Sequence, residues 1–585
     1  MRLFGELSLQ GTEREPRWCV TGSLPVMFLN RLIPEAYTLR SDQCALSDTL
    51  SNVETIEWLM MRFPLSINKN AKRYWNRRVK EVHVGCQRRE TLEALVPVTP
   101  SRQFIGKLRD FQKLGLDFLM KTGGHALLAD EMGLGKGVQA LAYLATAKDA
   151  LPVYIVAPLV TLKHWEREII KFLRVSGKSA TVKVIRSGKR APLPSANIYL
   201  TNYDLLAKRV EDVRDKVRTV IFDEIQALRN TQTLRYRAAL ELLGGKHIVH
   251  VIGLSGTPIH NNGAELWAIT NLLRPGLLGT YHEFVAQHCG ILFGKIHARN
   301  PKGLYELLRQ EFLLRRRKFE VMSELPPLLR VKEYIDADLD LYKAEVTSIL
   351  ETLDQKLEFA KTEFERTAFK QHVVTQERQV AAICKIPYVV KWVRACLESE
   401  QPIIVYFHHL LVRDALVRYL KEWDPCIIVG GQTDTERDNE IQRFQGGKSR
   451  LLLSGIRAGS LGITLTAGSV VVFAELDWTP AWHRQAEGRS HRIGQENQVL
   501  AYYLVAEGTL DEKVAEVLMS KTQEINELLG DEPEGENTPE ALNAIEELRK
   551  LPAFQKVPII TAKYPDMINR STRHLPPPDS EPQTY

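Results

Sequence analysis

The feature that most constrains the fold is an alternation of short apolar runs with longer helical stretches, which occurs twice along the chain. Strands separated by helices need crossover connections and therefore pair in parallel. The first series of apolar runs lies at 126–129, 153–158, 181–185, 198–202, 219–224 and 248–256, and the second at 403–407, 426–431, 450–455, 470–476 and 500–507. The sequence thus predicts an α/β fold with two parallel sheets.

The texture of the sequence divides the 585 residues into five segments. Residues 1–100 mix short apolar stretches with turns, which predicts a small α+β N-terminal module. We expect one parallel-sheet lobe over 101–276 and a second over 399–528, joined by charged, Leu-rich helical insertions over 277–398. Residues 529–585 are rich in Gly, Pro and acidic residues, which predicts a mobile C-terminal tail.

Composition excludes several classes of protein. Hydrophobic residues make up 44% and charged residues 25% of the chain, so it is neither mainly disordered, nor collagen, nor a coiled-coil rod. No apolar run approaches the roughly 18 residues of a membrane span, and the N-terminus has no signal-peptide core. The seven cysteines form no CxxC pair, which argues against a zinc site or a disulfide framework. These features predict an intracellular protein.

A glycine-rich turn at 130–137 follows the first apolar run of the first series and leads into a helical stretch. Backbone N–H groups at such a turn and at the helix N-terminus form a cradle for phosphate, and Lys136 can reach the outer phosphates. The alternative is a tight loop or a helix cap without a ligand. The predicted nucleotide-binding residues here are Asp130, Glu131, Met132, Gly133, Leu134, Gly135, Lys136 and Gly137.

Paired carboxylates end the apolar run at 219–224. Asp223 is placed to hold a magnesium ion, directly or through water, and Glu224 to orient and deprotonate an attacking water. The alternative, an acid pair that caps the next helix, is disfavoured by the phosphate loop upstream. Ser255 and Thr257 end the next run, where small hydroxyl groups can sense the carboxylate pair.

The second series is followed by a polar stretch with three regularly spaced side chains. Gln485, Arg489 and Arg492 are separated by four and three residues, which predicts one helical face. Arginines brought to a γ-phosphate from a second domain stabilise the charge of the transition state. A salt-bridged helix would show the same spacing.

The N-terminal segment contains a basic stretch over 69–80 that includes aromatic residues. Basic charge interleaved with aromatic rings suits a nucleic acid. An equally good interpretation is a solvated helix face whose Trp75 belongs to a local core. The predicted DNA contacts in this stretch are Lys72, Arg73, Arg77 and Arg78.

Taken together, residues from about 104 to 525 resemble the SWI/SNF-type family of superfamily-two helicase-like ATPases, and within it the branch that contains the annealing helicases. The resemblance rests on motif blocks in the expected order. They are LRDFQKLGLDFL (108–119), ADEMGLGKG (129–137), APLVTLKHWEREI (157–169), TNYDLL (201–206), SGTPIHNNGAELW (255–267), LLRRRKFEVMSELPP (313–327), GQTDTERDNEIQRFQ (431–445), AGSLGITLTAG (458–468) and QAEGRSHRIGQ (485–495).

This resemblance implies two RecA-like lobes that bind duplex DNA and step along it with ATP and Mg²⁺. It implies that Gln112 contacts adenine. It also implies that Gln226, Ser255 and Thr257 couple the use of ATP to movement along DNA. Segment 313–327 resembles the family's helical-insertion signature. The implied DNA contacts are Lys163, Trp165, Thr201, Tyr203, Thr464 and Trp478.

Two positions depart from the family pattern. Lys136 is followed by Gly137, where the family has the Thr or Ser whose hydroxyl coordinates magnesium. The acid motif ends in Gln226 instead of His, a milder change because an amide also forms hydrogen bonds.

These observations predict a DNA-dependent ATPase that translocates on double-stranded DNA and remodels branched DNA or displaces bound protein. One alternative is a strand-separating helicase. Another is a DNA scaffold that binds nucleotide but hydrolyses it poorly because of Gly137. We expect a monomer on duplex or branched DNA, without a membrane partner, in the cytoplasm of a bacterium or a phage-infected cell rather than in a nucleus.

Overall fold

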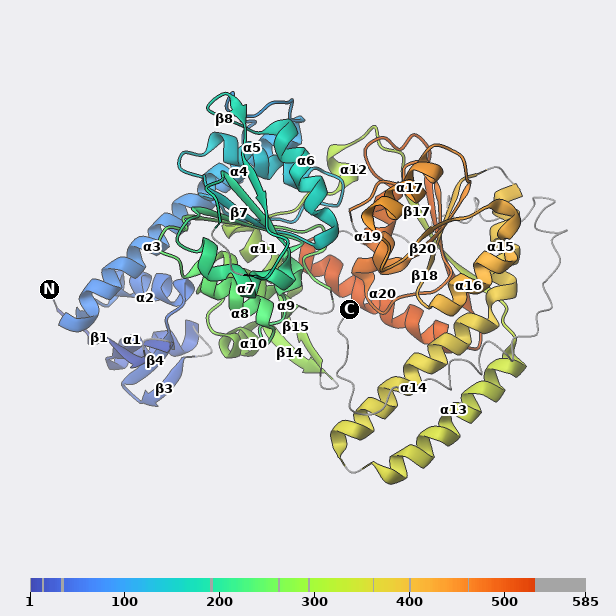
Figure 1. Cartoon of the computed structure of the whole chain (residues 1–585). Coiled ribbons are helices and arrows are strands. Elements are labelled where there is room, and N and C mark those ends of the chain that lie inside the picture. The colour runs from blue at the N-terminus through green and yellow to red at the C-terminus, as the bar shows by residue number, and fades with distance from the viewer. Residues whose placement is uncertain are drawn as a thin grey trace. The chain divides into compact units, whose positions relative to one another are not determined.

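The computed structural model describes residues 2–12, 15–32, 36–189, 193–260, 263–292, 295–360, 362–398, 401–460 and 462–531. These residues form two compact units (Figure 1). Unit 1 contains residues up to Val321 together with 524–531, and unit 2 contains residues 322–523. Each unit is described by itself.

Unit 1 begins with a small α+β module, which confirms the prediction for the N-terminal segment. Its five-stranded sheet has the order β3-β4-β2-β1-β5 and is antiparallel except between β1 and β5. Trp18, Ile56 and Trp75 are among the residues of its core. The elements are β1 (Glu6–Thr12), β2 (Glu15–Thr21), α1 (Ser23–Leu32), β3 (Tyr37–Arg40), β4 (Gln43–Ser47), α2 (Leu50–Arg62), β5 (Ser66–Ile67) and α3 (Lys69–Glu93).

The larger part of unit 1 is built on a seven-stranded sheet, with the order β10-β11-β7-β12-β13-β6-β16 and every pair parallel. Helices cover both faces, so the central strands are buried on both sides and read as continuous apolar runs. The strands are β6 (His125–Leu128), β7 (Val153–Val156), β10 (Val182–Val184), β11 (Ile198–Thr201), β12 (Thr219–Asp223), β13 (His250–Leu254) and β16 (Leu313–Leu314).

The helices and minor strands of this first lobe follow the chain around the sheet (Figure 1). They are α4 (Asp110–Lys121), α5 (Lys136–Thr146), η1 (Leu159–Thr161), α6 (Leu162–Phe172), β8 (Arg174–Val175), β9 (Lys178–Ser179), α7 (Tyr203–Val213), η2 (Ile225–Leu228), α8 (Leu234–Leu243), α9 (Glu265–Leu273), α10 (Tyr281–His288), β14 (Cys289–Leu292), β15 (Lys295–Ala298), α11 (Pro301–Glu311) and α12 (Lys318–Val321).

Unit 2 contains a second, six-stranded sheet, with the order β17-β22-β21-β18-β20-β19 and every pair parallel. Its strands are β17 (Leu328–Ile335), β18 (Ile403–Phe407), β19 (Cys426–Ile428), β20 (Leu451–Gly455), β21 (Val470–Phe473) and β22 (Val499–Ala506). Its helices are α15 (Ile386–Glu398), α16 (Leu410–Tyr419), η3 (Lys421–Trp423), α17 (Asp434–Gln445), α18 (Ile456–Gly459), α19 (Pro480–Ser490) and the first part of α20 (Leu510–Leu529). The predicted α/β class with two parallel sheets is confirmed.

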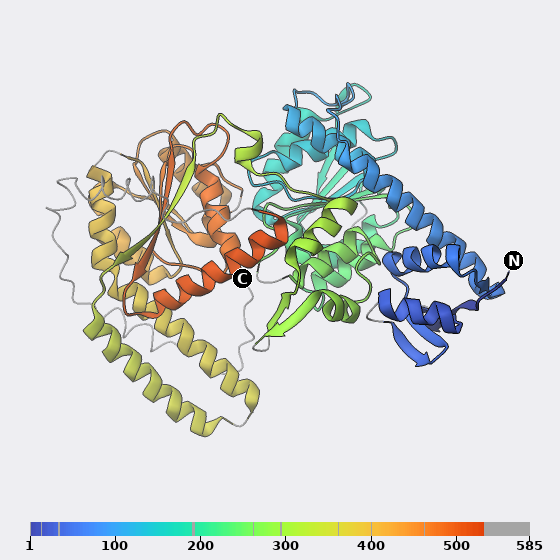
Figure 2. The same cartoon turned by 180° about the vertical axis from the view of Figure 1, so that it is seen from behind.

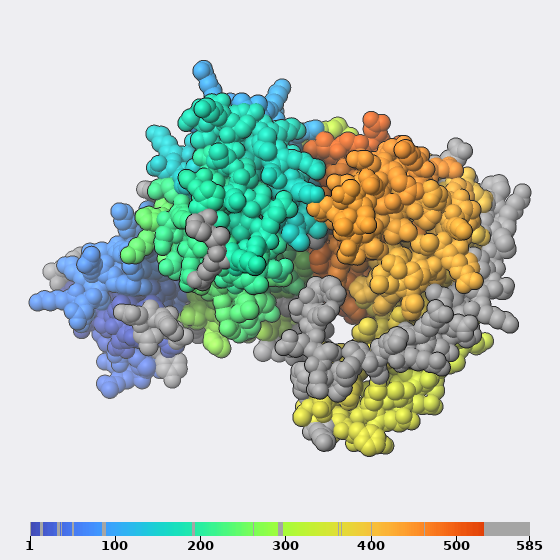
Figure 3. Space-filling model, viewed as in Figure 1, coloured from blue at the N-terminus to red at the C-terminus, as the bar shows by residue number. Residues whose placement is uncertain are grey.

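A helical hairpin projects from unit 2. It consists of α13 (Leu339–Phe359) and α14 (Glu363–Cys384), which run side by side in both views (Figures 1 and 2). Figure 3 shows its atoms in yellow. Among the described residues of the hairpin, a buried cluster forms around Tyr342, Ile349 and Cys384, whereas Phe359 at the end of α13 is 81% exposed.

The structure differs from the predicted segment boundaries at two places. The helical insertions of 277–398 are divided between the two units after Val321, and they contribute β16 to the first sheet and β17 to the second. Of the predicted tail 529–585, Leu529 is a buried residue of the first lobe's core, and 532–585 lie outside the described residues. In the part of the chain that the structure describes, no helix combines the length and apolarity needed to cross a membrane.

Candidate active site

The predicted phosphate loop connects β6 to α5, and Gly135 stands at its junction with the helix. This glycine has φ +74°, and a Cβ built on it would lie 2.5 Å from Nε2 of Gln112. Only glycine adopts this positive φ without strain and also leaves room for the Gln112 side chain. Gln112 donates from Nε2 to the carbonyl oxygen of Leu134 (3.2 Å) and accepts at Oε1 from the backbone N–H of Arg109. The side chain predicted to contact adenine therefore joins α4 to the loop.

Lys136 is the first residue of α5, and its ammonium group points back into the loop. Nζ donates to the carbonyl oxygen of Asp130 at 2.8 Å. Burial lowers the pKa of Lys136, and Glu224, Asp130 and Asp223 oppose this shift. The Lys136 ammonium group lies among these carboxylates and can also form charged hydrogen bonds with the phosphate groups of a nucleotide.

Cations of the segment 315–318 contact the two acids of the loop, and this pairing was not predicted from the sequence. Arg316 donates to both carboxylate oxygens of Asp130, from Nε at 2.9 Å, and to Oε1 of Gln139. Lys318 pairs with Glu131 (3.1 Å). Burial alone would raise the pKa of Glu131, but the charge of Lys318 holds it at about 2. The two loop acids thus fix the shape of the loop through charged hydrogen bonds.

The predicted acid pair ends β12. Burial, reinforced by the neighbouring Glu224, raises the pKa of Asp223 to about 7. Glu224 has the left-handed backbone conformation (φ +53°), which costs a residue other than glycine roughly 1–3 kcal/mol. Its Oε2 accepts a hydrogen bond from Nε2 of Gln226 at 2.5 Å. The strained backbone and this hydrogen bond together define where the Glu224 carboxylate lies.

Trp165 occupies the space beside Gly137. A Cβ built on Gly137 would lie 3.4 Å from the indole ring of Trp165, and Nε1 of this ring donates to Oδ2 of Asp223 at 2.8 Å. The indole therefore packs beside Gly137, and its N–H holds the carboxylate expected to bind metal. Trp165 is 4% exposed, and its predicted role as a DNA contact stays a prediction.

The acid pair fits a magnesium ion. Asp223 and Glu224 are adjacent carboxylates at the end of β12, and carboxylate oxygens are ligands that Mg²⁺ prefers. In the described residues no cluster of three or more His, Cys, Asp or Glu side chains could hold a metal. A magnesium ion at Asp223 would thus take most of its ligands from phosphate and water.

The segment after β13 closes the site. Ser255 and Thr257 are both buried, and the hydroxyl of Ser255 accepts the backbone N–H of Thr257 at 3.0 Å. Gly256 between them lies against the phosphate loop, since a Cβ there would be 2.2 Å from Cγ of Met132 and 3.3 Å from Nζ of Lys136. The side-chain amide of Gln226 donates to Glu224. Coupling through Gln226, Ser255 and Thr257 stays a prediction.

In unit 2, α19 carries Gln485 and Arg489 and ends at Ser490, so Arg492 lies beyond the helix and not on its face as predicted. The two arginines nevertheless converge, because Nη1 of each donates to the carbonyl oxygen of Ile463, at 3.4 Å for Arg489 and 3.1 Å for Arg492. Gln485 is buried. Ile463 belongs to the block 458–468. Arg489 on the helix and Arg492 just beyond it therefore both hold this block through hydrogen bonds.

The ends of β18 and β21 in unit 2 carry a second buried charged cluster. Oε2 of Glu475 accepts the backbone N–H groups of His408 (2.7 Å) and His409 (2.9 Å), and Oε1 pairs with the His409 ring. Burial, together with the positive charge of Arg378 and the His409 ring, lowers the pKa of His408 to about 4, against the opposing charges of Glu475 and Asp477. His408 is therefore held neutral near pH 7.

The other predicted DNA contacts divide into buried and exposed side chains. Thr201 is fully buried, and Tyr203 is 5% exposed and donates from its hydroxyl to the carbonyl oxygen of Asp223 (2.7 Å). Their assignment as DNA contacts stays a prediction. Thr464 is exposed, while Lys163 and Trp478 are half-buried. These three stay predictions.

The basic stretch lies on α3, and the structure combines both interpretations of it. Trp75 is a core residue, and Arg78 donates from Nε to Oδ1 of Asp48 at 3.0 Å, so Arg78 is part of the module's interior. Lys72, Arg73 and Arg77 are exposed. A DNA surface on α3 would therefore use these three exposed side chains, and the contact predicted for the half-buried Arg78 stays a prediction.

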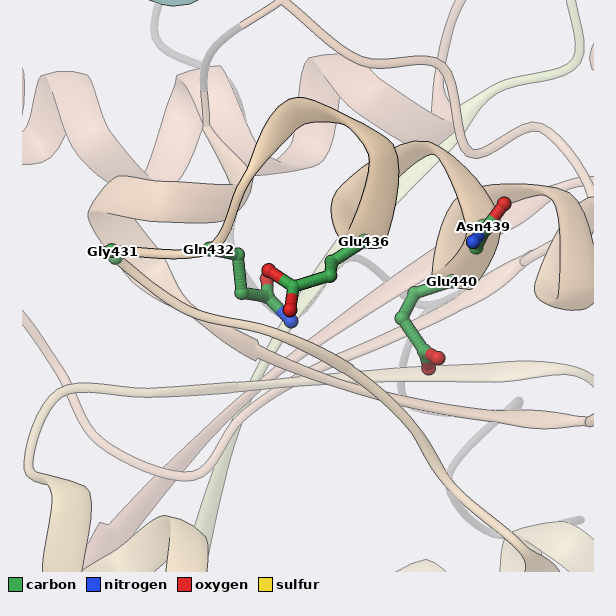
Figure 4. A pocket seen from close by; sticks show the side chains of 6 residues that line it. Gly431, Gln432, Glu436, Asn439 and Glu440 are labelled. Atoms are coloured by element: carbon green, nitrogen blue, oxygen red, sulfur yellow. The ribbon is translucent and has the colours of Figure 1, made fainter.

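A pocket of unit 2 lies between the end of β19 and α17 and is lined by glycines and by Gln432, Glu436, Asn439 and Glu440 (Figure 4). Glu436 accepts the backbone N–H of Thr433, which caps α17, and Glu440 accepts that of Ile427. Two carboxylates already held by backbone groups disfavour a phosphate here. The candidate nucleotide site remains the one in unit 1.

Comparison with known proteins agrees with this geometry. Residues 111–389 match the SNF2-related domain and residues 384–494 the helicase conserved C-terminal domain. The "SWI/SNF-related matrix-associated actin-dependent regulator of chromatin subfamily A-like protein 1" of Xenopus laevis is 32% identical over 434 residues, which cover 72% of this chain and 44% of that protein.

Two further relatives extend the range of organisms. The "DNA annealing helicase and endonuclease ZRANB3" of Homo sapiens is 30% identical (75% of this chain, 42% of the relative). The "Putative ATP-dependent helicase/translocase YwqA" of Bacillus subtilis is 29% identical (74% and 49%). This chain thus spans less than half the length of these relatives.

Among solved structures, the "Sulfolobus solfataricus SWI2/SNF2 ATPase core in complex with dsDNA" is 25% identical, with a TM-score of 0.36, and the match covers 78% of this chain and 98% of that one. The two matched domains and the relatives indicate the same branch of the family that the motif blocks indicate. The chain belongs to the SNF2-related family of helicase-like ATPases.

Proposed function

We propose that the chain hydrolyses ATP at the loop between β6 and α5. The observation that carries the proposal is the half-buried acid pair at the end of β12, whose charges act on the ammonium group of Lys136 at the phosphate loop. Phosphoryl transfer needs a cradle for the phosphates, a cation, a metal ligand and a base, and these residues supply all four. Their arrangement supports a hydrolytic site better than a passive binding site, because Glu224 has no use in binding alone.

In the proposed reaction, the backbone N–H groups at the start of α5 and Lys136 hold the β- and γ-phosphates. Asp223 would hold Mg²⁺, which neutralises the charge that develops on the phosphate oxygens. Glu224 orients the attacking water and accepts its proton. Gln226 keeps the Glu224 carboxylate in place through its 2.5 Å hydrogen bond.

Arg489 and Arg492 are proposed to act as arginine fingers on the γ-phosphate when the lobes close on ATP. Both guanidinium groups are anchored by one carbonyl oxygen, that of Ile463, so they would move together with the block 458–468. Gln485 is proposed to act with them. Closure on nucleotide and opening after hydrolysis would convert each ATP into a step.

We further propose double-stranded DNA as the track, with remodelling of branched DNA or displacement of bound protein as the result. The names of the relatives support DNA as the partner, and the bacterial relative is named a helicase or translocase. The exposed basic side chains of α3 support a contact with phosphates. We propose that the chain acts as a monomer on DNA inside the cell.

The test is the ATPase rate with single-stranded, duplex and forked DNA in parallel, beside triplex-displacement and strand-unwinding assays on the same preparation. Stimulation by duplex or fork, with triplex displacement and without unwinding, is expected for a translocase. Unwinding would favour the strand-separating alternative. Nucleotide binding without turnover on any DNA would favour the scaffold.

A further inference from the structure

Arg315 is a buried cation that touches both halves of the nucleotide site. Its side chain is 5% exposed. Nη1 donates to the carbonyl oxygen of Ala129 at 2.6 Å and to that of Gly256 at 2.9 Å. Ala129 begins the phosphate loop, and Gly256 lies against Met132 and Lys136 of the same loop. One guanidinium group therefore sets the spacing between the loop and the segment 255–257.

The charge of Arg315 is compensated by a residue more than two hundred positions away. Nε and Nη2 donate to the two carboxylate oxygens of Asp531 at 3.0 and 2.6 Å. Asp531 is itself 6% exposed. A bidentate pair of this kind fixes the guanidinium plane, and removal of one partner leaves an uncompensated buried charge. The orientation in which Arg315 reaches its two carbonyl oxygens thus depends on Asp531.

The local fold after α20 explains how Asp531 reaches this place. The helix ends at Leu529, and Gly530 follows with φ +65°. The N–H of Asp531 donates to the carbonyl oxygen of Asn526 (2.8 Å), and that of Gly530 to Glu527 (3.4 Å). This is the Schellman motif, which turns the chain sharply after a helix.

Two further contacts hold the end of α20 in place. A Cβ on Gly530 would lie 2.3 Å from the ring of Tyr305, so the turn packs closely on α11. Ile525, Leu528 and Leu529 belong to the core of the first lobe, whereas Val514 and Ala515 of the same helix belong to a core of unit 2. One helix thus carries residues of both units, and Asp531 lies beyond the two matched domains.

We propose that Asp531 is a positioning residue for ATP hydrolysis: by holding Arg315 it keeps the segment 255–257 in register with the phosphate loop, so that turnover depends on the seating of the end of α20. This inference rests on the proposed ATPase function. It predicts a selective defect, because the loop itself is fixed by other pairs, Arg316 with Asp130 and Lys318 with Glu131. Nucleotide binding should therefore survive a loss of Asp531, whereas the rate of the chemical step should not.

The test compares Asp531→Asn with wild type in DNA-stimulated ATPase and in equilibrium binding of a fluorescent ATP analogue. We expect kcat to fall about ten-fold or more and the Kd of the analogue to change by less than about three-fold. Gly530→Ala, which strains the turn and meets Tyr305, should give the same pattern by a different physical route. Glu306→Gln is the matched control, because Glu306 forms an exposed ion pair with Arg309 in the same unit and should leave both values unchanged.

A double variant separates positioning from mere stability. Arg315→Met with Asp531→Leu removes the buried charge altogether, so thermal stability should return toward wild type while kcat stays low, since neither carbonyl oxygen regains a donor. If Asp531→Asn does not fold, this variant carries the test alone. Recovery of kcat together with stability would overturn the proposal, as would a folded Asp531→Asn with wild-type kcat. A wild type without ATPase activity would instead overturn the proposed function on which the inference rests.

Discussion

Replacement of Gly137 by Thr tests the most unusual feature of the phosphate loop. The added Cβ would lie 3.4 and 3.5 Å from two ring atoms of Trp165, which is ordinary van der Waals contact, so the side chain fits without displacing the indole. A hydroxyl group here can supply one oxygen ligand to Mg²⁺ in place of water. If this ligand contributes about 1 kcal/mol, as a typical hydrogen bond does, the magnesium concentration for half-maximal ATPase should fall about five-fold.

Two side effects of the substitution need a control. Threonine is better than glycine in a helix by a few tenths of a kcal/mol, roughly, which changes stability rather than metal affinity. Any movement of Trp165 would remove the hydrogen bond that lowers the pKa of Asp223 and would weaken metal binding. Gly137→Val reproduces the shape of threonine without its hydroxyl, so the difference between the Thr and Val variants isolates the ligand.

The assay is a magnesium titration of DNA-stimulated ATPase for wild type and both variants, with binding of a fluorescent ADP analogue followed in the same titration. We expect Thr to need the least magnesium and Val to need as much as wild type or more. Coincident Thr and Val curves would refute the reasoning, because the hydroxyl would then have no ligand role. Activity in Gly137→Thr alone, with wild type inactive at every magnesium concentration, would instead support the scaffold alternative.

Three further predictions concern the base, the DNA surface and the pH dependence. Glu224→Gln should abolish hydrolysis while ATP and DNA binding persist, since it removes only the proton acceptor; substantial turnover would disprove the assignment. Replacing Lys72, Arg73 and Arg77 by Ala should reduce the slope of log affinity against log salt for duplex DNA by up to about 3, at roughly 0.9 per phosphate contact, and an unchanged slope would leave α3 as a solvated face. The pKa of His408 is about 4 in the folded chain and 6.5 ordinarily, so the unfolded chain binds the extra proton and stability should fall by about 3 kcal/mol as the pH drops from 6.5 to 4. His408→Gln should flatten this part of the curve in urea titrations, and parallel curves would contradict the cause.

Matched controls follow from the same structure. Glu241→Gln removes a half-exposed carboxylate of the first lobe and should leave turnover unchanged. A variant that removes equal charge from the projecting hairpin, with alanine at three exposed positions, should keep the salt slope; these are Lys343, Arg366 and Lys370.

Apart from β16 and β17, which lie in the segment predicted to be helical, the sequence predicted the strands of both sheets. Strands buried on two faces leave continuous apolar runs that need no long-range information. The loop, the acid pair and the lysine were predictable for a related reason: each follows directly from a strand, and the carboxyl ends of parallel strands meet at one edge of the sheet. Local order along the chain was sufficient in each of these cases.

What the sequence did not predict depends on contacts between distant residues. Trp165, Thr201 and Tyr203 lie in motif blocks associated with DNA, yet they are buried, and burial is decided by the packing of α6, β11 and α7 on the rest of the lobe. The pairing of Arg315 with Asp531 spans 216 positions and has no local signal. Arg492 was placed on a helix by spacing alone, but the helix ends at Ser490.

The left-handed backbone of Glu224 has a consequence for evolution in the laboratory. Glycine adopts this conformation without strain, so Glu224→Gly should relieve the local backbone and remove the proton acceptor in one step. Selection for thermal resistance alone would then favour glycine at position 224 and yield an inactive protein. Selection for turnover would retain the strained Glu224. A library screened separately for the two traits should enrich opposite amino acids there, so heat tolerance is an unreliable guide when this protein is engineered for speed.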